Sequence, residues 1–251
     1  MSNGEQDRYR LIFEHALEAI FIAQDQVVKF FNRQTEVLTG YSRDEIPATP
    51  FISVIHLDDR RLVYERHQKR LAGGQAPDVY SFRVVTKQGT IRWVELKVVP
   101  ILWEGKPATL NFMADISDRK RAEEALRESE ASYRHLFENA AEGIFQTTAE
   151  GKLVRANPAF ARIFGYSSPA EIEAAVTDIG AQLYADPAAR KEFLARLLAE
   201  GTVRRYAVEA VRKNGERFWV SINCRVLRDE RGNFAGVEGT NVEIPAPTRA
   251  K

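Results

Sequence analysis

Residues 115–140 read DISDRKRAEEALRESEASYRHLFENA, and the rest of the chain is organised around this stretch. No Gly or Pro interrupts it, and Ala, Glu, Arg and Leu dominate it. It therefore predicts one long helix over residues 117–140, with Ser117 as its N-cap. Either this helix is a solvated spacer or it pairs in parallel with a second copy. We favour pairing because apolar residues recur at heptad-like spacing: Leu126, Tyr133 and Leu136.

Composition excludes several classes of protein. The chain has 251 residues with 36 basic and 35 acidic side chains, so its charge does not point to a nucleic-acid partner. No run approaches the roughly 18 apolar residues of a membrane span, and the start lacks the apolar core of a signal peptide. The single cysteine, Cys224, cannot form an internal disulfide. We expect a cytoplasmic protein with no membrane contact in this segment.

The sequence contains two copies of one pattern, separated by the central stretch. RYRLIFEHALEAIF in the first copy matches SYRHLFENAAEGIF in the second, and VVTKQGTIRWVEL matches AVRKNGERFWVSI. The matches follow the same order in both copies: residues 8–21 with 132–145, Asn32 with Asn157, Gly40-Tyr41-Ser42 with Gly165-Tyr166-Ser167, and residues 84–96 with 210–222. We therefore expect two similar domains over residues 1–118 and 132–245, joined by the helix 117–140 and followed by a tail, 246–251.

Each copy gives the same coarse pattern of secondary structure. A helix precedes two short strands, short helices follow, and then comes a longer helix at 58–72 or 186–200. Three strands close each copy, and Gly in the sequences Lys87-Gln88-Gly89-Thr90 and Lys213-Asn214-Gly215-Glu216 indicates hairpins. Strands at both ends with helices between them predict the α+β class with an antiparallel sheet.

Both copies resemble PAS sensor domains. The resemblance covers about residues 7–245 and is carried by the matched openings, the Asn after the second strand, the Gly-Tyr-Ser sequence and the KQGTIRWVE and KNGERFWVS hairpins. The first copy ends in Asp115-Ile116-Ser117, which is similar to the family's Asp-Ile-Thr exit motif. The resemblance implies a five-stranded antiparallel sheet that encloses a cavity against short helices. It also implies a bacterial signalling protein in which the central helix carries a signal.

The exit motif supplies candidates for signal relay. The resemblance implies that the exit Asp contacts the preceding hairpin, so we expect Asp115 to contact Arg92 or Trp93. In the second copy we match Asp115 with Asn241, and Pro245 follows shortly after. Because proline cannot continue a helix, no signalling helix is expected to leave the second copy within this chain. An output enzyme, such as a histidine kinase or a diguanylate cyclase, would then lie in a longer parent protein.

Hairpin register predicts which side chains face each cavity. A two-residue turn at Gln88-Gly89 pairs Arg83 with Val94, and the corresponding turn in the second copy pairs Glu209 with Val220. Arg83 would then hold an anionic group, and Glu209 a cationic or hydroxyl-bearing one, unless a bulge turns them to solvent. The predicted ligand-binding residues are Arg83, Val94, Leu96 and Asn32 in the first copy and Glu209, Val220, Ile222 and Asn157 in the second.

Coloured cofactors are not expected. The resemblance implies that a flavin photosensor needs a cysteine on a helix, whereas Cys224 lies in a strand-like run. Haem needs an axial ligand, and His67 on the long helix of the first copy is the candidate. Its charged and polar neighbours in sequence favour a solvated helix residue instead. The second copy has no histidine after His135.

The sequence leaves three hypotheses for function. No phosphate-binding loop, nucleophile elbow or clustered metal ligands are present, so the chain itself is not expected to be an enzyme. It is expected to be a sensory module that binds a small ligand and relays a change through the central helix. The alternatives are a ligand-free dimerisation scaffold and a haem-based gas sensor that uses His67. The apolar outer face of each sheet needs a cover, which either the helix before each copy or a second subunit can supply. We expect a homodimer built on these helices.

Overall fold

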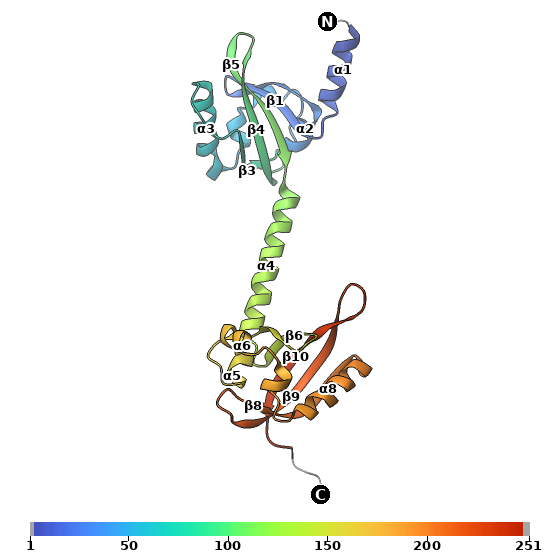
Figure 1. Ribbon diagram of the computed structural model, residues 1–251. Helices are drawn as coiled ribbons and strands as arrows, with labels where there is room; N and C mark the ends of the chain where they lie inside the picture. The colour runs from blue at the N-terminus through green and yellow to red at the C-terminus, as the bar shows by residue number, and fades with distance from the viewer. Residues whose placement is uncertain (1–2, 248–251) are drawn as a thin grey trace. The chain divides into compact units, whose positions relative to one another are not determined.

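The computed structural model describes residues 3–247, which form two compact units divided between Arg127 and Glu128. We call them domain A and domain B, and each is described by itself (Figure 1). Each contains a five-stranded antiparallel sheet flanked by helices, as predicted. The dividing point falls within the central helix α4 (Ser117–Asn139). Of the predicted tail 246–251, residues 248–251 lie outside the described part.

Domain A begins with a helix and ends with three long strands. Its sheet has the strand order β2-β1-β5-β4-β3. The elements are α1 (Asn3–Glu14), β1 (Ala19–Gln24), β2 (Val27–Phe31), α2 (Arg33–Thr39), the 3-10 helices η1 (Ile46–Ala48) and η2 (Phe51–Val54), α3 (Leu57–Leu71), β3 (Val79–Val85), β4 (Ile91–Trp103) and β5 (Lys106–Asp115).

Domain B repeats this arrangement after α4. Its sheet order, β7-β6-β10-β9-β8, is that of domain A strand for strand. The elements are β6 (Gly143–Thr148), β7 (Leu153–Ala156), α5 (Pro158–Ile163), α6 (Pro169–Ala175), α7 (Ile179–Gln182), α8 (Pro187–Glu200), β8 (Thr202–Val211), β9 (Arg217–Arg228) and β10 (Phe234–Ile244).

The β3–β4 hairpin does not have the predicted register. The Thr86 N–H donates to the carbonyl of Thr90, so the loop has three residues and ends in Gly89 at φ 82°. A three-residue loop with a left-handed Gly shifts the pairing by one, and Arg83 lies opposite Trp93 rather than Val94. Because side chains alternate along a strand, this shift moves Arg83 away from the cavity face.

The β8–β9 hairpin differs from its predicted register for the same reason. The Arg212 N–H donates to the carbonyl of Glu216, and Gly215 has φ 87°. Glu209 therefore lies opposite Trp219 rather than Val220. The predicted cavity positions of Arg83 and Glu209 are both wrong. Phe82 and Val84 in domain A, like Val208 and Ala210 in domain B, lie on the buried face instead.

The C-terminal ends of the two sheets, at the end of β5 and of β10, also align differently from the prediction. Asp115 lies opposite Val94, and Glu243 lies opposite Val220, the residue that corresponds to Val94. Glu243-Ile244-Pro245 is therefore the counterpart of Asp115-Ile116-Ser117. The predicted match of Asp115 with Asn241 is wrong because the β9–β10 connection, which includes a bulge, is longer than the β4–β5 connection.

Candidate functional site

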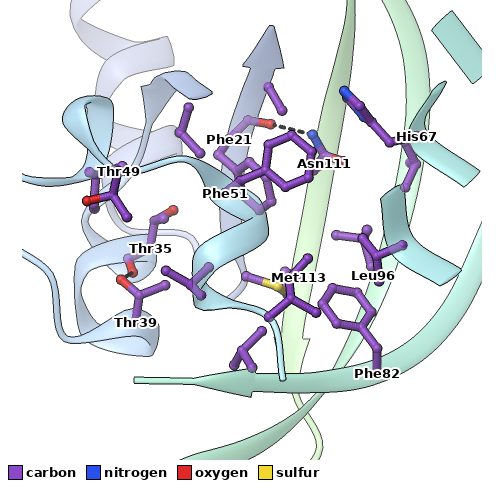
Figure 2. A pocket seen from close by; sticks show the side chains of 18 of the residues that line it. Phe21, Thr35, Thr39, Thr49, Phe51, His67, Phe82, Leu96, Asn111 and Met113 are labelled. Atoms are coloured by element: carbon purple, nitrogen blue, oxygen red, sulfur yellow. Dashed lines mark hydrogen bonds between the residues drawn. The ribbon is translucent and has the colours of Figure 1, made fainter. Parts of the chain in front are cut away.

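Domain A contains an internal cavity of about 70 Å³ between its sheet and the helices α2, η2 and α3. Figure 2 shows side chains from these elements around it. Most of the lining is apolar, with Phe82, Leu96 and Met113 on the sheet and Phe51 opposite them. Polar side chains among the lining residues are Thr35, Thr39, Tyr41, Thr49, His67, Arg70, Tyr80 and Asn111.

The corresponding cavity in domain B has a volume of only about 20 Å³. Counting from the two helix-capping asparagines, Asn32 and Asn157, places Phe160 at the position of Thr35 and Phe164 at that of Thr39. Both phenylalanines are buried, and their ring centroids lie 4.7 Å apart. Two phenyl rings in place of two hydroxyl-bearing side chains account for the smaller volume.

The long helices differ at the matching positions. α3 follows its cap, His56, and buries Val63 and His67, whereas α8 follows Asp186 and buries Phe193 and Leu197. The identical spacing places Leu197 at the position of His67. Domain A therefore has a histidine where domain B has a leucine.

His67 is not the solvated helix residue that its sequence neighbours suggested. It is 6% exposed, its ring meets Phe51 edge-on at 4.8 Å, and within the described part of the chain its Nε2 has no hydrogen-bond partner. Burial, together with the neighbouring charge of Arg70, lowers the pKa of His67 below its ordinary value of 6.5. Its imidazole is therefore neutral at pH 7.

The haem hypothesis does not fit the cavity. The cavity has a volume of about 70 Å³ and is therefore much smaller than a haem group. Cys224 lies in β9, as its strand-like pattern predicted. Burial raises the pKa of its thiol to about 12, so it is protonated at neutral pH.

The buried histidine gives domain A a distinct pH dependence. Because the folded-state pKa of His67 is lowered, the unfolded chain binds its proton first as the pH falls. The stability of domain A should therefore decline as the pH drops from about 7 to 5, and His67→Leu should remove that part of the decline. Urea unfolding followed through domain A amide signals measures the difference. A variant with the same slope as wild type would contradict the assignment.

The predicted ligand-binding residues lie in different places. Leu96 lines the domain A cavity, and Val220 and Ile222 line the small one in domain B. Val94 is fully buried on the same sheet face. Glu209 is partly exposed and pairs with Arg217 at 3.2 Å. Sequence reasoning missed Thr35, Thr39 and Arg70, although the exchange of Thr for Phe between the copies could have revealed the first two.

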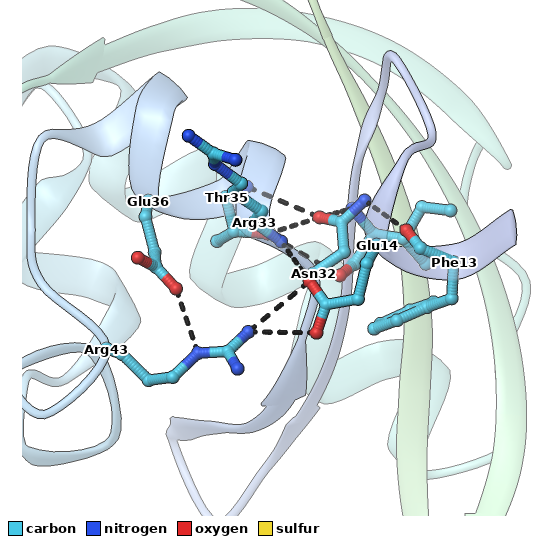
Figure 3. Close-up of polar contacts among 8 residues, drawn as sticks. Phe13, Glu14, Asn32, Arg33, Thr35, Glu36 and Arg43 are labelled. Carbon is cyan, nitrogen blue, oxygen red and sulfur yellow. Dashed lines mark hydrogen bonds and ion pairs between the residues drawn. The ribbon is translucent and has the colours of Figure 1, made fainter. Parts of the chain in front are cut away.

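Asn32 and Asn157 attach the preceding helix to each sheet. The Asn32 carboxamide is fully buried, accepts from the N–H of Ile20 at 2.9 Å and donates to the carbonyls of Phe13 and Glu18. Figure 3 shows this group beside the Arg43 ion pairs. Asn157 makes the equivalent bonds, including one to the carbonyl of Phe137 in α4. Neither asparagine is among the residues that line the cavities.

Arg83 connects the start of α3 to the sheet. Its guanidinium bonds both carboxylate oxygens of Asp59 at 2.9 Å and one of Asp58 at 3.1 Å. It also lies 5.6 Å from the centre of the Trp93 ring. Arg83 lowers the pKa of the Asp59 carboxyl by direct hydrogen bonding.

Trp93 in turn contacts the start of α4. The backbone N–H of Trp93 donates to Ser117 Oγ at 2.9 Å, and its backbone carbonyl accepts from the N–H of Ile116. Asp115 contacts Arg92 at 3.4 Å, which is the contact predicted for the exit motif, and accepts from the N–H of Ser117. The Asp115 carboxylate therefore caps α4, and the prediction that Ser117 supplies the cap is wrong.

The apolar seam of α4 is exposed in the single chain. The exposed fractions are 62% for Leu126, 51% for Tyr133 and 67% for Leu136. Tyr9 and Ile12 of α1, which match Tyr133 and Leu136 in sequence, are similarly exposed. Pairing along these helices remains a prediction.

Two family models match the chain, one in each copy. The model described as PAS fold matches residues 28–111, and the one described as PAS domain matches residues 141–242. Among the described residues, no helix has both the length and the apolarity needed to cross a membrane. The same residues contain no cluster of three or more side chains suited to hold a metal ion.

Two curated relatives are named as histidine kinases. The sensor histidine kinase TmoS of Ectopseudomonas mendocina is 35% identical over 108 residues, which is 41% of this chain and 10% of that protein. The blue-light-activated histidine kinase of Brucella anthropi is 34% identical over 104 residues, 40% of this chain and 20% of that protein. A sensory box histidine kinase/response regulator structure from Burkholderia thailandensis has 26% identity and a TM-score of 0.41, covering 51% of this chain and 99% of that one.

A five-stranded antiparallel sheet with short helices over an internal cavity defines a sensory domain class, and this chain has that fold twice. The chain belongs to the PAS family and consists of two PAS domains in tandem, joined by α4. It spans a tenth to a fifth of the length of the two kinases above. The relatives support a sensory role.

Proposed function

We propose that this chain is the sensory part of a larger, cytoplasmic signalling protein, in which domain A binds a small molecule and domain B does not. The contrast between the two cavities carries this proposal. Domain A has about 70 Å³ of space with Thr35, Thr39 and His67 in its wall, whereas domain B has about 20 Å³ and phenylalanines or leucine at the same positions. Domain B therefore fits the role of a ligand-free dimerisation scaffold, which the sequence offered as an alternative function for the whole chain.

The contacts of Arg83 suggest how occupancy of the cavity reaches α4. A ligand touches α3 at His67, and the first turn of α3 holds Arg83 through Asp59. Arg83 packs over Trp93, whose backbone bonds Ser117 and Ile116. Under this proposal a displacement of α3 changes the packing at the start of α4. A homodimer along the exposed seam transmits the change to an output enzyme elsewhere in the parent protein.

A substitution taken from domain B tests the proposal. Thr39→Phe places in domain A the side chain that Phe164 supplies in domain B, so it should fill the cavity and weaken the binding of small apolar fragments at least about tenfold. Thermal unfolding with a fragment library measures binding, and amide spectra check the fold. Thr90→Phe adds the same ring at an exposed position and should bind as wild type does. Undiminished binding by Thr39→Phe would refute the assignment of this cavity.

A further inference from the structure

Arg70 is a buried cation without a counterion. Its side chain lines the domain A cavity and is 6% exposed. Its guanidinium donates to the carbonyl of Pro77 and hydrogen-bonds the Tyr80 hydroxyl, but its Nε has no partner. It makes no ion pair with any acidic residue that the structure describes. The α3 carbonyls around this last-turn residue offset part of its charge, but a buried unpaired guanidinium remains costly.

Neighbouring groups add positive charge and hydrogen-bond donors at this end of the cavity. The Arg66 and Arg70 guanidinium carbons lie 4.4 and 5.3 Å from the Tyr80 ring centre. His67 is one helical turn before Arg70 and has the second unpartnered nitrogen in the same wall. Two buried side chains with unsatisfied nitrogens, next to an otherwise apolar cavity, favour a ligand with an anionic end and a hydrocarbon body.

Domain B lacks these features at the matching positions. The spacing that places Leu197 at the position of His67 places Glu200 at the position of Arg70. Glu200 pairs with Arg196 at 2.9 Å on the surface, so the charge there is balanced. The unpaired cation therefore occurs in the domain with the larger cavity.

We infer that the ligand of domain A is a small carboxylate that binds Arg70 and His67 through its charged group and fills the apolar cavity with its hydrocarbon part. This inference rests on the proposed function and adds the chemical class of the ligand. The cavity volume of about 70 Å³ favours a short-chain acid such as propionate, butyrate or valerate.

Matched acids and amides test the charge requirement directly. The full chain is titrated with propionate, butyrate and valerate, and with the amide of each, while backbone amides and the Arg70 Nε–H signal are followed by NMR. We expect the best acid to bind at least about tenfold more tightly than its amide and to shift the Arg70 Nε–H signal. Acids that bind no more tightly than their amides, or that leave the Arg70 signal unmoved, would overturn the inference.

Two variants locate the effect. Arg70→Met keeps an unbranched apolar stem against Tyr80 but removes the charge, so acid binding should fall to the level of the amide. Arg66→Met removes the other guanidinium that lies over the Tyr80 ring. Because Arg66 does not line the cavity, this variant should retain acid binding. Equal losses in both variants would contradict a specific role for Arg70. If neutral apolar fragments bind domain A and the acids do not, this inference fails alone; if neither binds, the proposed function fails with it.

Discussion

Phe164→Thr is expected to destabilise domain B by about 3–5 kcal/mol, because it removes a buried ring from a packed core and leaves a cavity. Phe164 is 4% exposed and packs against Phe160 at 4.7 Å and Phe218 at 5.5 Å between ring centroids. The threonine hydroxyl adds the cost of a buried polar group. The variant also gives domain B the residue that domain A has at this position, so it should enlarge the cavity of domain B.

Urea unfolding followed by amide signals from each domain measures this effect separately in the two domains. Val154→Thr is the control, since Val154 is 51% exposed and the change should cost less than about 0.5 kcal/mol. Domain A should unfold as in wild type in both variants. A loss below about 1 kcal/mol for Phe164→Thr would mean that the phenylalanines do not form the core described here.

Asn32→Ala is expected to destabilise domain A by about 3 kcal/mol or more. The carboxamide is fully buried and bonds Ile20, Phe13 and Glu18. Alanine leaves the N–H groups of Ile20 and Thr35 and the carbonyls of Phe13 and Glu18 without this partner, and each unsatisfied buried group costs about 1–3 kcal/mol. The bond to Phe13 holds the end of α1, so that helix should also separate from the sheet more readily.

Hydrogen exchange and urea unfolding of the full chain measure both effects. Gln75→Ala removes an exposed carboxamide from a loop of the same domain and should change stability by less than about 0.5 kcal/mol. Protection of β1 amides should fall in Asn32→Ala and stay unchanged in the control. Unchanged protection in both variants would refute the structural role of Asn32.

Sequence patterns predicted the architecture because the signals that define it are local. The duplicated segments, the turn glycines and the uninterrupted helix 117–140 can each be recognised from a continuous stretch of sequence. The two α+β domains follow from them. Hairpin register depends on one further choice, the length of the loop. Gly89 closes a three-residue loop rather than a two-residue one, and this single difference removed Arg83 from the cavity and placed Phe82 in it.

The cavity residues were harder to predict because they depend on packing. His67 has polar neighbours in sequence, yet Val63, His67 and Arg70 are four and three residues apart and share one buried face of α3. Whether a polar helix residue is buried depends on the helix face on which it lies, and not on the polarity of the residues next to it in sequence. The volume difference between the domains required the alignment of Thr39 with Phe164, which the sequence contains but which only the structure connects to a cavity.

Domain A has an unfilled cavity, whereas side chains fill most of the corresponding space in domain B. Xenon occupies apolar cavities without needing a specific chemical group, so it tests this claim independently of the natural ligand. Amide spectra of the full chain recorded under increasing xenon pressure should show saturable shifts around Thr39, Phe82 and Leu96, with no saturable shifts around Phe164 and Ile222. Equal shifts in both domains, or none in domain A, would contradict the account.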